Sequence, residues 1–265
     1  MSEYRYPSEA IILAVTFLLL GGLLVLTAIP TFCLAPALVI VFIAMAYFSN
    51  QSHHRQIMQQ AQLVTPQSAP ALANAIETCK RRLDEKDVEV YVLNTRERNA
   101  YTFGITEPQV VVIYSPLLTI MDEDEIKFVI GHELGHVVLG HTWLNTIIGG
   151  MAGVPSSFAV AVIITLIFRA WNRACEYSAD RAGLLACGNL NKAVLALVEI
   201  VAGDIRSQVQ FQNALAAIDA EDDSFTGILS ESLSSHPMLI KRIKELQSYA
   251  ASDEGKRAMA KRAGK

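Results

Sequence analysis

Two histidines that stand four residues apart, His132 and His136, have a glutamate, Glu133, between them. On an α-helix, residues i and i+4 lie on one face, so both imidazoles could reach a single Zn²⁺ through a ring nitrogen. The carboxylate of Glu133 would lie beside the ion, where it could take a proton from water and later give it to a leaving amine. The pattern predicts a hydrolytic zinc site; two metal-free histidines on an amphipathic helix are the alternative.

The residues around this motif predict that it lies in the middle of a helix. Asp122 followed by Glu125 is typical of a helix N-cap with its capping-box partner. Apolar residues then recur with helical spacing at Ile126, Val129, Ile130, Leu134 and Val137. This context favours the metal site over a chance match.

A hydrolytic zinc site needs a third protein ligand, for which His141 and Cys175 are weak candidates. The metzincin pattern has a third histidine six residues after the second and a glycine at the third, whereas this chain has His141 at the fifth and Leu139 at the third. We expect His141 to lie at the helix end, near the last carbonyls. Cys175 could bind as a thiolate, but no partner Cys or His stands at a suitable spacing.

Glu176 is the better third ligand because Asp180 follows it by four residues on the same predicted helix face. Glu176 could bind the metal while Asp180 accepts the second N–H of a ligating histidine. Without the motif at His132, such a pair would usually be two solvated acids on a helix surface.

Four motifs together resemble the HtpX-like zinc metallopeptidases, which are relatives of the CAAX prenyl proteases. They are Tyr114 to Leu118, the helix with His132 and His136, Arg173 to Gly183, and His236-Pro237 followed by Arg242-Ile243. The resemblance runs from about Pro70 to Leu246. It implies a gluzincin-type site in which His132, His136 and Glu176 bind one zinc ion per chain and Glu133 is the general base. It also implies that Asp180 orients a histidine and that His236 stabilises the oxyanion or approaches the zinc. Arg242 would brace the segment that begins at His236. On the same resemblance, the strand lining the substrate cleft includes Asn99, Ala100 and Tyr101.

The N-terminal region predicts a transmembrane helical hairpin over residues 1–55. The chain is 52% hydrophobic and 18% charged, and residues 10–52 contain no Asp, Glu, Lys or Arg. This run is long enough for two spans of about 20 residues, so we expect helices at about 10–29 and 35–50 around Pro30 and Pro36. Arg5 and Arg55 flank the hairpin and its turn has no basic residue, which predicts that both ends are cytoplasmic.

A second uncharged stretch, residues 142–168, is too short for two spans. A single span would place His136 and Glu176 on opposite sides of the membrane, where they could not share an ion. We therefore expect a helical pair that turns near Gly149 to Pro155 and dips its tip into the bilayer, with an apolar pair buried in protein as the alternative.

The fold class expected is α+β: a mainly helical zincin-type protease domain over residues 56–249 with a small β-sheet. Periodicity predicts strands at 88–93, 99–103 and 109–114, and helices at 66–83, at 190–218 before an acidic loop at 221–223, and from 237 to 249. The strand from Asn99 could lie at a sheet edge and pair with an extended peptide. Residues 250–265 are expected to be a basic, flexible tail, and the net charge of −4 argues against a nucleic-acid partner.

These observations together predict a zinc endopeptidase integral to the cell (inner) membrane, with its catalytic domain on the cytoplasmic side. Its partners would be the lipid bilayer and peptide or protein substrates, which the resemblance implies to be misfolded or unassembled membrane proteins. Two alternatives remain open. A CAAX-type processing protease would need more apolar segments to build its chamber, and a catalytically idle zinc-stabilised scaffold would have no use for Glu133.

Overall fold

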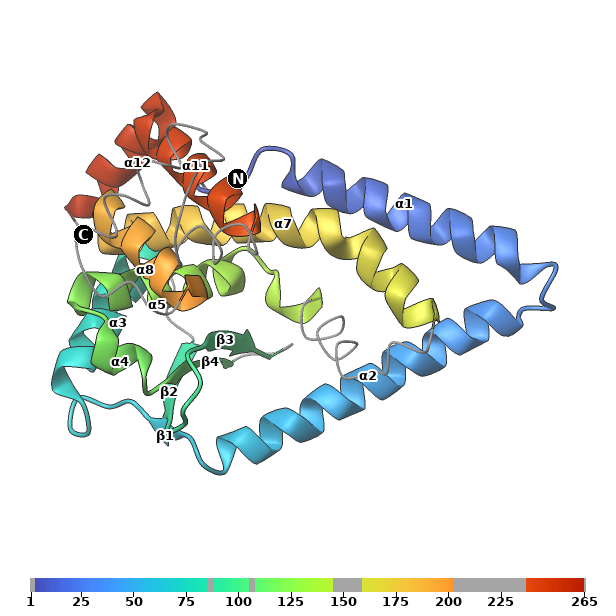
Figure 1. The fold of residues 1–265 in the computed structure, drawn as a ribbon, viewed down its shortest axis with the longest axis horizontal. Coiled ribbons are helices and arrows are strands. Elements are labelled where there is room, and N and C mark those ends of the chain that lie inside the picture. Colours follow the sequence, from blue (N-terminus) through green and yellow to red (C-terminus); the bar gives the residue numbers. More distant parts are fainter. Residues whose placement is uncertain (1–2, 85–87, 105–107, 145–158, 203–236, 265) are drawn as a thin grey trace, which may run out of the picture.

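The computed structural model describes residues 3–84, 88–104, 108–144, 159–202 and 237–264. This part of the chain is mostly helical and holds a small mixed sheet (Figure 1). The predicted turn at 149–155, the acidic loop at 221–223 and His236 lie outside the described residues.

The sheet has four strands in the order β1-β2-β4-β3. They are β1 (Gln62–Leu63), β2 (Val88–Leu93), β3 (Ala100–Phe103) and β4 (Gln109–Tyr114). β2 and β4 are parallel, whereas β1 and β3 are antiparallel to their neighbours. β3 therefore forms one edge of the sheet, as predicted for the strand that begins near Asn99, and among the described residues only one side of β3 is paired.

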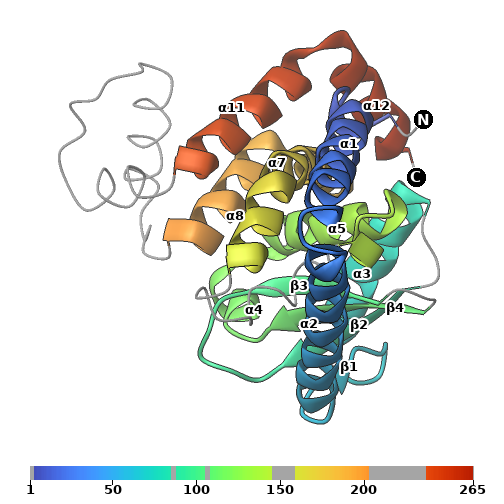
Figure 2. The same cartoon turned by 90° about the vertical axis from the view of Figure 1, so that its right-hand side faces the viewer.

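Helices α3 (Pro70–Leu83) and α5 (Glu123–Val138) cover one face of this sheet (Figure 2). Val90, Val111 and Ile113 of the strands pack there with Ile76 and Ile126 in the main hydrophobic core. The short helix α4 (Leu117–Ile120) leads into α5. The predicted capping box is confirmed, since Asp122 and Glu125 each accept a hydrogen bond from the backbone N–H of the other.

α5 packs closely against α7 (Ala159–Cys187) because two glycines leave room for it. A Cβ added at Gly131 would lie 2.2 Å from the Cβ of Ala186, and one at Gly135 would lie 2.7 Å from the Cβ of Ala182. Such distances are far inside van der Waals contact. The small residues therefore allow α7 to bring Glu176 next to the histidines of α5.

We expect Gly131→Ala to lower the free energy of unfolding by about 1–3 kcal/mol, the usual effect of an overpacked contact. Adding Ala186→Gly should restore part of this loss by removing the opposing methyl group. Gly22→Ala is the control, because a Cβ at Gly22 meets nothing within 4 Å. Denaturation of the detergent-solubilised chain measures the effect, and equal stability of Gly131→Ala and Gly22→Ala would contradict this packing.

Helices α1 (Glu9–Ala28) and α2 (Leu34–Met58) extend away from the rest of the fold and converge at their far ends (Figure 1). Among the described helices, α1 alone is long and apolar enough to cross a membrane, with a mean hydropathy of 2.7. Large apolar side chains such as Leu18, Val25 and Leu26 are exposed on it. α2 ends against the sheet, where Ile57 and Met58 contact the face opposite α3 and α5. A transmembrane hairpin remains a prediction.

The C-terminal part of the chain adds α8 (Leu190–Ala202), α11 (Pro237–Ala251) and α12 (Asp253–Ala263). The prediction of a flexible tail over 250–265 is wrong for the residues described, because α12 is an ordered helix. Ser252 caps it by accepting a hydrogen bond from the N–H of Gly255, and the side chain of Arg262 donates to Asp84 at 2.9 Å. Because α12 is rich in Lys and Arg, its sequence did not indicate that one face of the helix, which includes Ala258, is buried.

Candidate active site

α5 and α7 bring His132, His136 and Glu176 together at one end of a cleft. The Nε2 atoms of His132 and His136 each lie 3.6 Å from one carboxylate oxygen of Glu176. One possible ligand atom from each residue lies within 4.8 Å of the others. These separations exceed a hydrogen bond and leave room for an ion among the three side chains.

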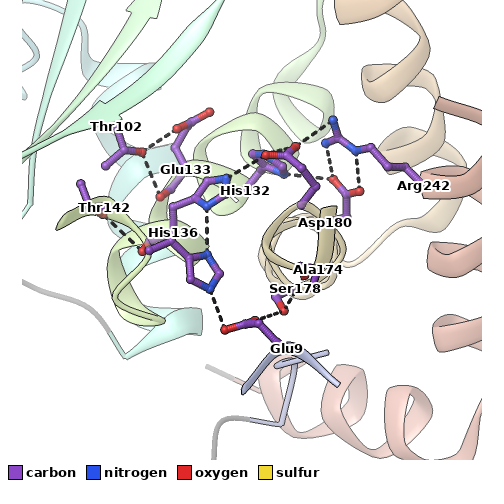
Figure 3. A network of polar contacts seen from close by, with 12 residues as sticks. Glu9, Thr102, His132, Glu133, His136, Thr142, Ala174, Ser178, Asp180 and Arg242 are labelled. Atoms are coloured by element: carbon purple, nitrogen blue, oxygen red, sulfur yellow. Dashed lines mark hydrogen bonds and ion pairs between the residues drawn. The ribbon is translucent and has the colours of Figure 1, made fainter. Parts of the chain in front are cut away.

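Asp180 fixes the orientation of His132, one helical turn after Glu176 on α7 (Figure 3). Its Oδ1 lies 3.0 Å from Nδ1 of His132, and its side chain is buried. A carboxylate accepts a hydrogen bond, so His132 carries its proton on Nδ1 and turns the lone pair of Nε2 toward Glu176.

Arg242 reaches the site from α11 and contacts both acids. It donates to the two oxygens of Asp180 at 2.8 and 2.6 Å, and its Nη1 lies 2.9 Å from Glu176. Burial opposes ionisation of the acids, but Arg242 and the histidines overcome it and hold the pKa of Glu176 well below its usual value. The pKa of Asp180 is lowered for the same reasons, so both groups are carboxylates at neutral pH.

A metal cation fits this donor set. The lone pairs of two imidazole Nε2 atoms face an ionised carboxylate, and only a cation or a proton can join three such acceptors. Two histidines and a glutamate form a typical catalytic zinc site. Cys175, one of the two weaker candidates for the third ligand, lies in an apolar cluster with Phe168 and Trp171, and burial raises the pKa of its thiol.

Thr102 of β3 holds the carboxylate of Glu133 (Figure 3). Its hydroxyl donates to Oε2 of Glu133 at 2.5 Å and lies 3.2 Å from the backbone carbonyl oxygen of the same residue. Glu133 is only 7% exposed, so this bond is sheltered from water. Thr102 was not predicted as a site residue, although it directly follows Asn99, Ala100 and Tyr101 on the strand expected to bind substrate.

We expect Thr102→Val to lower the rate of peptide cleavage by about tenfold. The variant loses the hydrogen bond that orients Glu133, and a loss of roughly 1.4 kcal/mol in transition-state stabilisation slows a reaction about tenfold. Thr102→Ser keeps the hydroxyl and is the control. Cleavage kinetics and metal content should be measured together. A valine variant as active as the serine variant would show that the hydroxyl does not position Glu133.

His141 lies near the last carbonyls of α5, as predicted, but its side chain also has contacts that the prediction did not include. Its backbone N–H does donate to the carbonyl of His136 at 2.9 Å, but its side chain is buried and its Nδ1 lies 3.0 Å from Nδ1 of His136. The spacing in the sequence excluded His141 as a metzincin-type metal ligand. It did not indicate that the His141 side chain contacts His136, a candidate metal ligand.

The cleft beside these residues has a volume of about 320 Å³ and runs along β3. Its lining includes Asn99, Ala100, Tyr101 and Thr102 on one side, and His132, Glu133, His136, Glu176 and Arg242 on the other. The structure thus gathers the predicted site residues at one place, except His236, which lies outside the described residues. An edge strand beside a glutamate and three possible metal ligands is the arrangement expected of a peptide-hydrolysing zincin.

The fold and the site are those of a metallopeptidase. The sequence profile of peptidase family M48 matches residues 66–250, and the chain belongs to this family. A protease HtpX homolog of Gemmatimonas aurantiaca is 26% identical in an alignment of 223 positions, which covers 72% of this chain and 80% of that protein. One of Burkholderia ambifaria is 27% identical in an alignment of 265 positions, which covers 88% of this chain and 92% of that protein. The plastoglobule-localized metallopeptidase 48 of Arabidopsis thaliana is 28% identical over 194 residues, covering 67% and 56%. The predicted resemblance to HtpX-like metallopeptidases is thereby confirmed.

Proposed function

We propose that this chain is a membrane-anchored zinc endopeptidase that cuts membrane proteins on the cytoplasmic side of the cell membrane. The observation that carries the proposal is the convergence of His132, His136 and Glu176, whose ligand atoms lie within 4.8 Å of one another beside Glu133. Together with the family membership, it supports one catalytic zinc ion per chain.

When bound, zinc would supply Lewis acidity to water and to the peptide carbonyl. Glu133 is placed to accept the proton of the attacking water and to return it to the leaving amine. Thr102 orients Glu133, and Asp180 orients His132. Arg242 keeps Glu176 and Asp180 ionised.

The edge strand β3 is the proposed substrate strand. Its backbone could hydrogen-bond an extended peptide at Asn99, Ala100 and Tyr101, which line the cleft next to Glu133. Main-chain pairing accepts many sequences, as suits an enzyme that handles misfolded proteins. His236, before α11, remains proposed as an oxyanion-stabilising residue.

The membrane anchor proposed is the hairpin of residues 1–55, with the protease domain at 56–249. The apolar exterior of α1 supports insertion, and Arg5 and Arg55 favour a cytoplasmic position for both ends. In this arrangement the apolar insert of 142–168 would dip into the bilayer and hold the cleft near juxtamembrane segments of substrates. α7, which extends from Ala159 beside α1, is consistent with that placement.

Membranes that hold the Glu133→Gln form as a substrate trap would test the proposal. We expect membrane proteins to accumulate on the trap, and their cytoplasmic juxtamembrane segments to be cut when the parent chain replaces it. Enrichment of prenylated proteins would favour CAAX-type processing. If the Glu133→Gln form and the parent chain bind the same proteins and neither cuts them, the chain is an idle scaffold and the proposed proteolysis is contradicted.

A further inference from the structure

The segment before α1 is docked on the protease body by specific polar contacts. The N–H of Tyr6 donates to the hydroxyl of Ser178 on α7 at 2.8 Å, and a guanidinium nitrogen of Arg5 donates to the carbonyl of Leu139 at 2.8 Å. The side chain of Tyr4 is buried in the main hydrophobic core. Residues Tyr4 to Tyr6 are therefore part of the folded catalytic unit.

This docking buries the carboxylate of Glu9, the first residue of α1, which is only 1% exposed (Figure 3). One of its oxygens lies 3.0 Å from Nε2 of His141, and the other accepts the hydroxyl hydrogen of Ser178. Arg5 forms an ion pair with it one turn earlier. A buried acid with such a set of partners is held in one position.

A series of hydrogen bonds begins at His136, the proposed metal ligand, and ends at Glu9. When Nε2 of His136 binds zinc, its lone pair points to the ion and its proton is on Nδ1, which lies 3.0 Å from Nδ1 of His141. His141 must accept that hydrogen at Nδ1, and it therefore carries its own proton on Nε2, facing Glu9. One arrangement of protons satisfies every contact from His136 to the carboxylate.

The two histidine ligands are thus supported in parallel ways. His132 donates directly to Asp180, whereas His136 donates to His141, which donates to Glu9. Both series end on a buried carboxylate, the usual device that fixes the orientation of a ligating imidazole and makes it a better ligand. The difference is that Asp180 belongs to the motif on α7, whereas Glu9 belongs to the apolar N-terminal helix.

We propose that His141 and Glu9 are positioning residues for the metal ligand His136, so that docking of the first apolar helix completes the metal site. This inference rests on the proposed function only in taking His136 as a zinc ligand. It implies that zinc affinity depends on residues outside the region that the M48 profile matches.

A second metal site is the competing interpretation, since ligand atoms of Glu9, His141 and Cys175 also lie within 4.8 Å of one another. The contacts argue against it. Arg5 already supplies a positive charge to Glu9, and both ring nitrogens of His141 have partners. A second cation there would displace those partners.

The test measures zinc affinity of the full chain in detergent by competition with a chelator. We expect Glu9→Gln to weaken zinc binding by about tenfold and His141→Phe by about 10–100-fold, as changes behind a ligand usually do. Glu3→Gln is the matched control, because Glu3 lies in the same docked segment but pairs with Lys261 of α12. Its zinc affinity should equal that of the parent.

A double-mutant cycle separates positioning from a general loss of structure. If Glu9 acts through His141, Glu9→Gln should have almost no further effect on zinc affinity in the His141→Phe background. Should His141→Phe fail to fold, His141→Leu serves in its place, because its side chain has neither a donor nor an acceptor for the two ring contacts. The visible spectrum of the cobalt-substituted chain should also change in Glu9→Gln and not in Glu3→Gln.

The outcomes are distinct. A parent chain that binds zinc, with unchanged affinity in Glu9→Gln, overturns this inference alone. Additive effects of Glu9→Gln and His141→Phe overturn it as well. Two zinc ions per chain, one of them lost in Cys175→Ala, would replace it with the second metal site. A parent chain that binds no zinc overturns the proposed function together with this inference.

Discussion

Replacing Glu133 with glutamine is expected to slow cleavage of an unfolded protein such as casein by about 10²–10⁴-fold, the usual contribution of a general base. The zinc content should stay at the parent value, because Glu133 contacts Thr102 and is not among the three converging ligands. Casein cleavage and metal content, determined on the same preparation, measure both effects.

Glu123→Gln is the matched control for this variant. Glu123 begins the same helix, α5, and its exposed side chain pairs with Lys127 outside the cleft. It should keep full activity. Undiminished cleavage by Glu133→Gln would contradict the mechanism, and loss of zinc from it would mean that Glu133 is a ligand.

Removal of the Glu176 side chain should abolish zinc retention, because it takes away the anionic member of the three converging groups. We expect Glu176→Ala to lose its metal after mild chelation and to lose proteolysis with it. Asp180→Asn should instead weaken zinc binding by about 10–100-fold, since it alters only the partner of His132. Metal analysis after graded chelation distinguishes the two variants.

The neighbouring Cys175→Ala is the control, because Cys175 is buried beside Glu176 on α7 but is not among the three groups that converge with His132. It should retain zinc as well as the parent does. The ligand assignment would be wrong if Cys175→Ala released zinc while Glu176→Ala held it.

Local spacing in the sequence was sufficient to predict which side chains share a helix face at the candidate site. His132 and His136 share a helix face, and so do Glu176 and Asp180, because an α-helix brings every fourth residue to the same side. The structure places Glu176 opposite the two histidines. The spacing did not predict how closely α5 and α7 pack. That packing depends on the contacts of Gly131 with Ala186 and of Gly135 with Ala182.

Contacts between distant segments were not predictable in the same way. Glu9 and His141 are 132 residues apart, and Glu9 read from the sequence is simply an acid before an apolar run. Thr102 and Glu133 meet only because β3 forms the sheet edge beside α5. Such pairs arise from tertiary packing, which leaves no periodic signal in one sequence.

The strands show the same division between local and tertiary information. Alternating and continuous apolar runs predicted β2 and β4 with their observed bounds, Val88–Leu93 and Gln109–Tyr114. The order β1-β2-β4-β3 was not predicted, and neither was β1, whose two residues carry no pattern. The tail was misjudged because charge dominates α12, whereas small buried residues such as Gly255 and Ala258 fix its position.

X-ray absorption at the zinc edge of the purified full chain tests the central claim most directly. The site formed by His132, His136 and Glu176 predicts one zinc ion per chain with nitrogen and oxygen neighbours at about 2.0–2.2 Å and the signature of two imidazoles. A sulfur neighbour at about 2.3 Å, or a zinc spectrum that is unchanged in Glu176→Ala, would contradict this assignment.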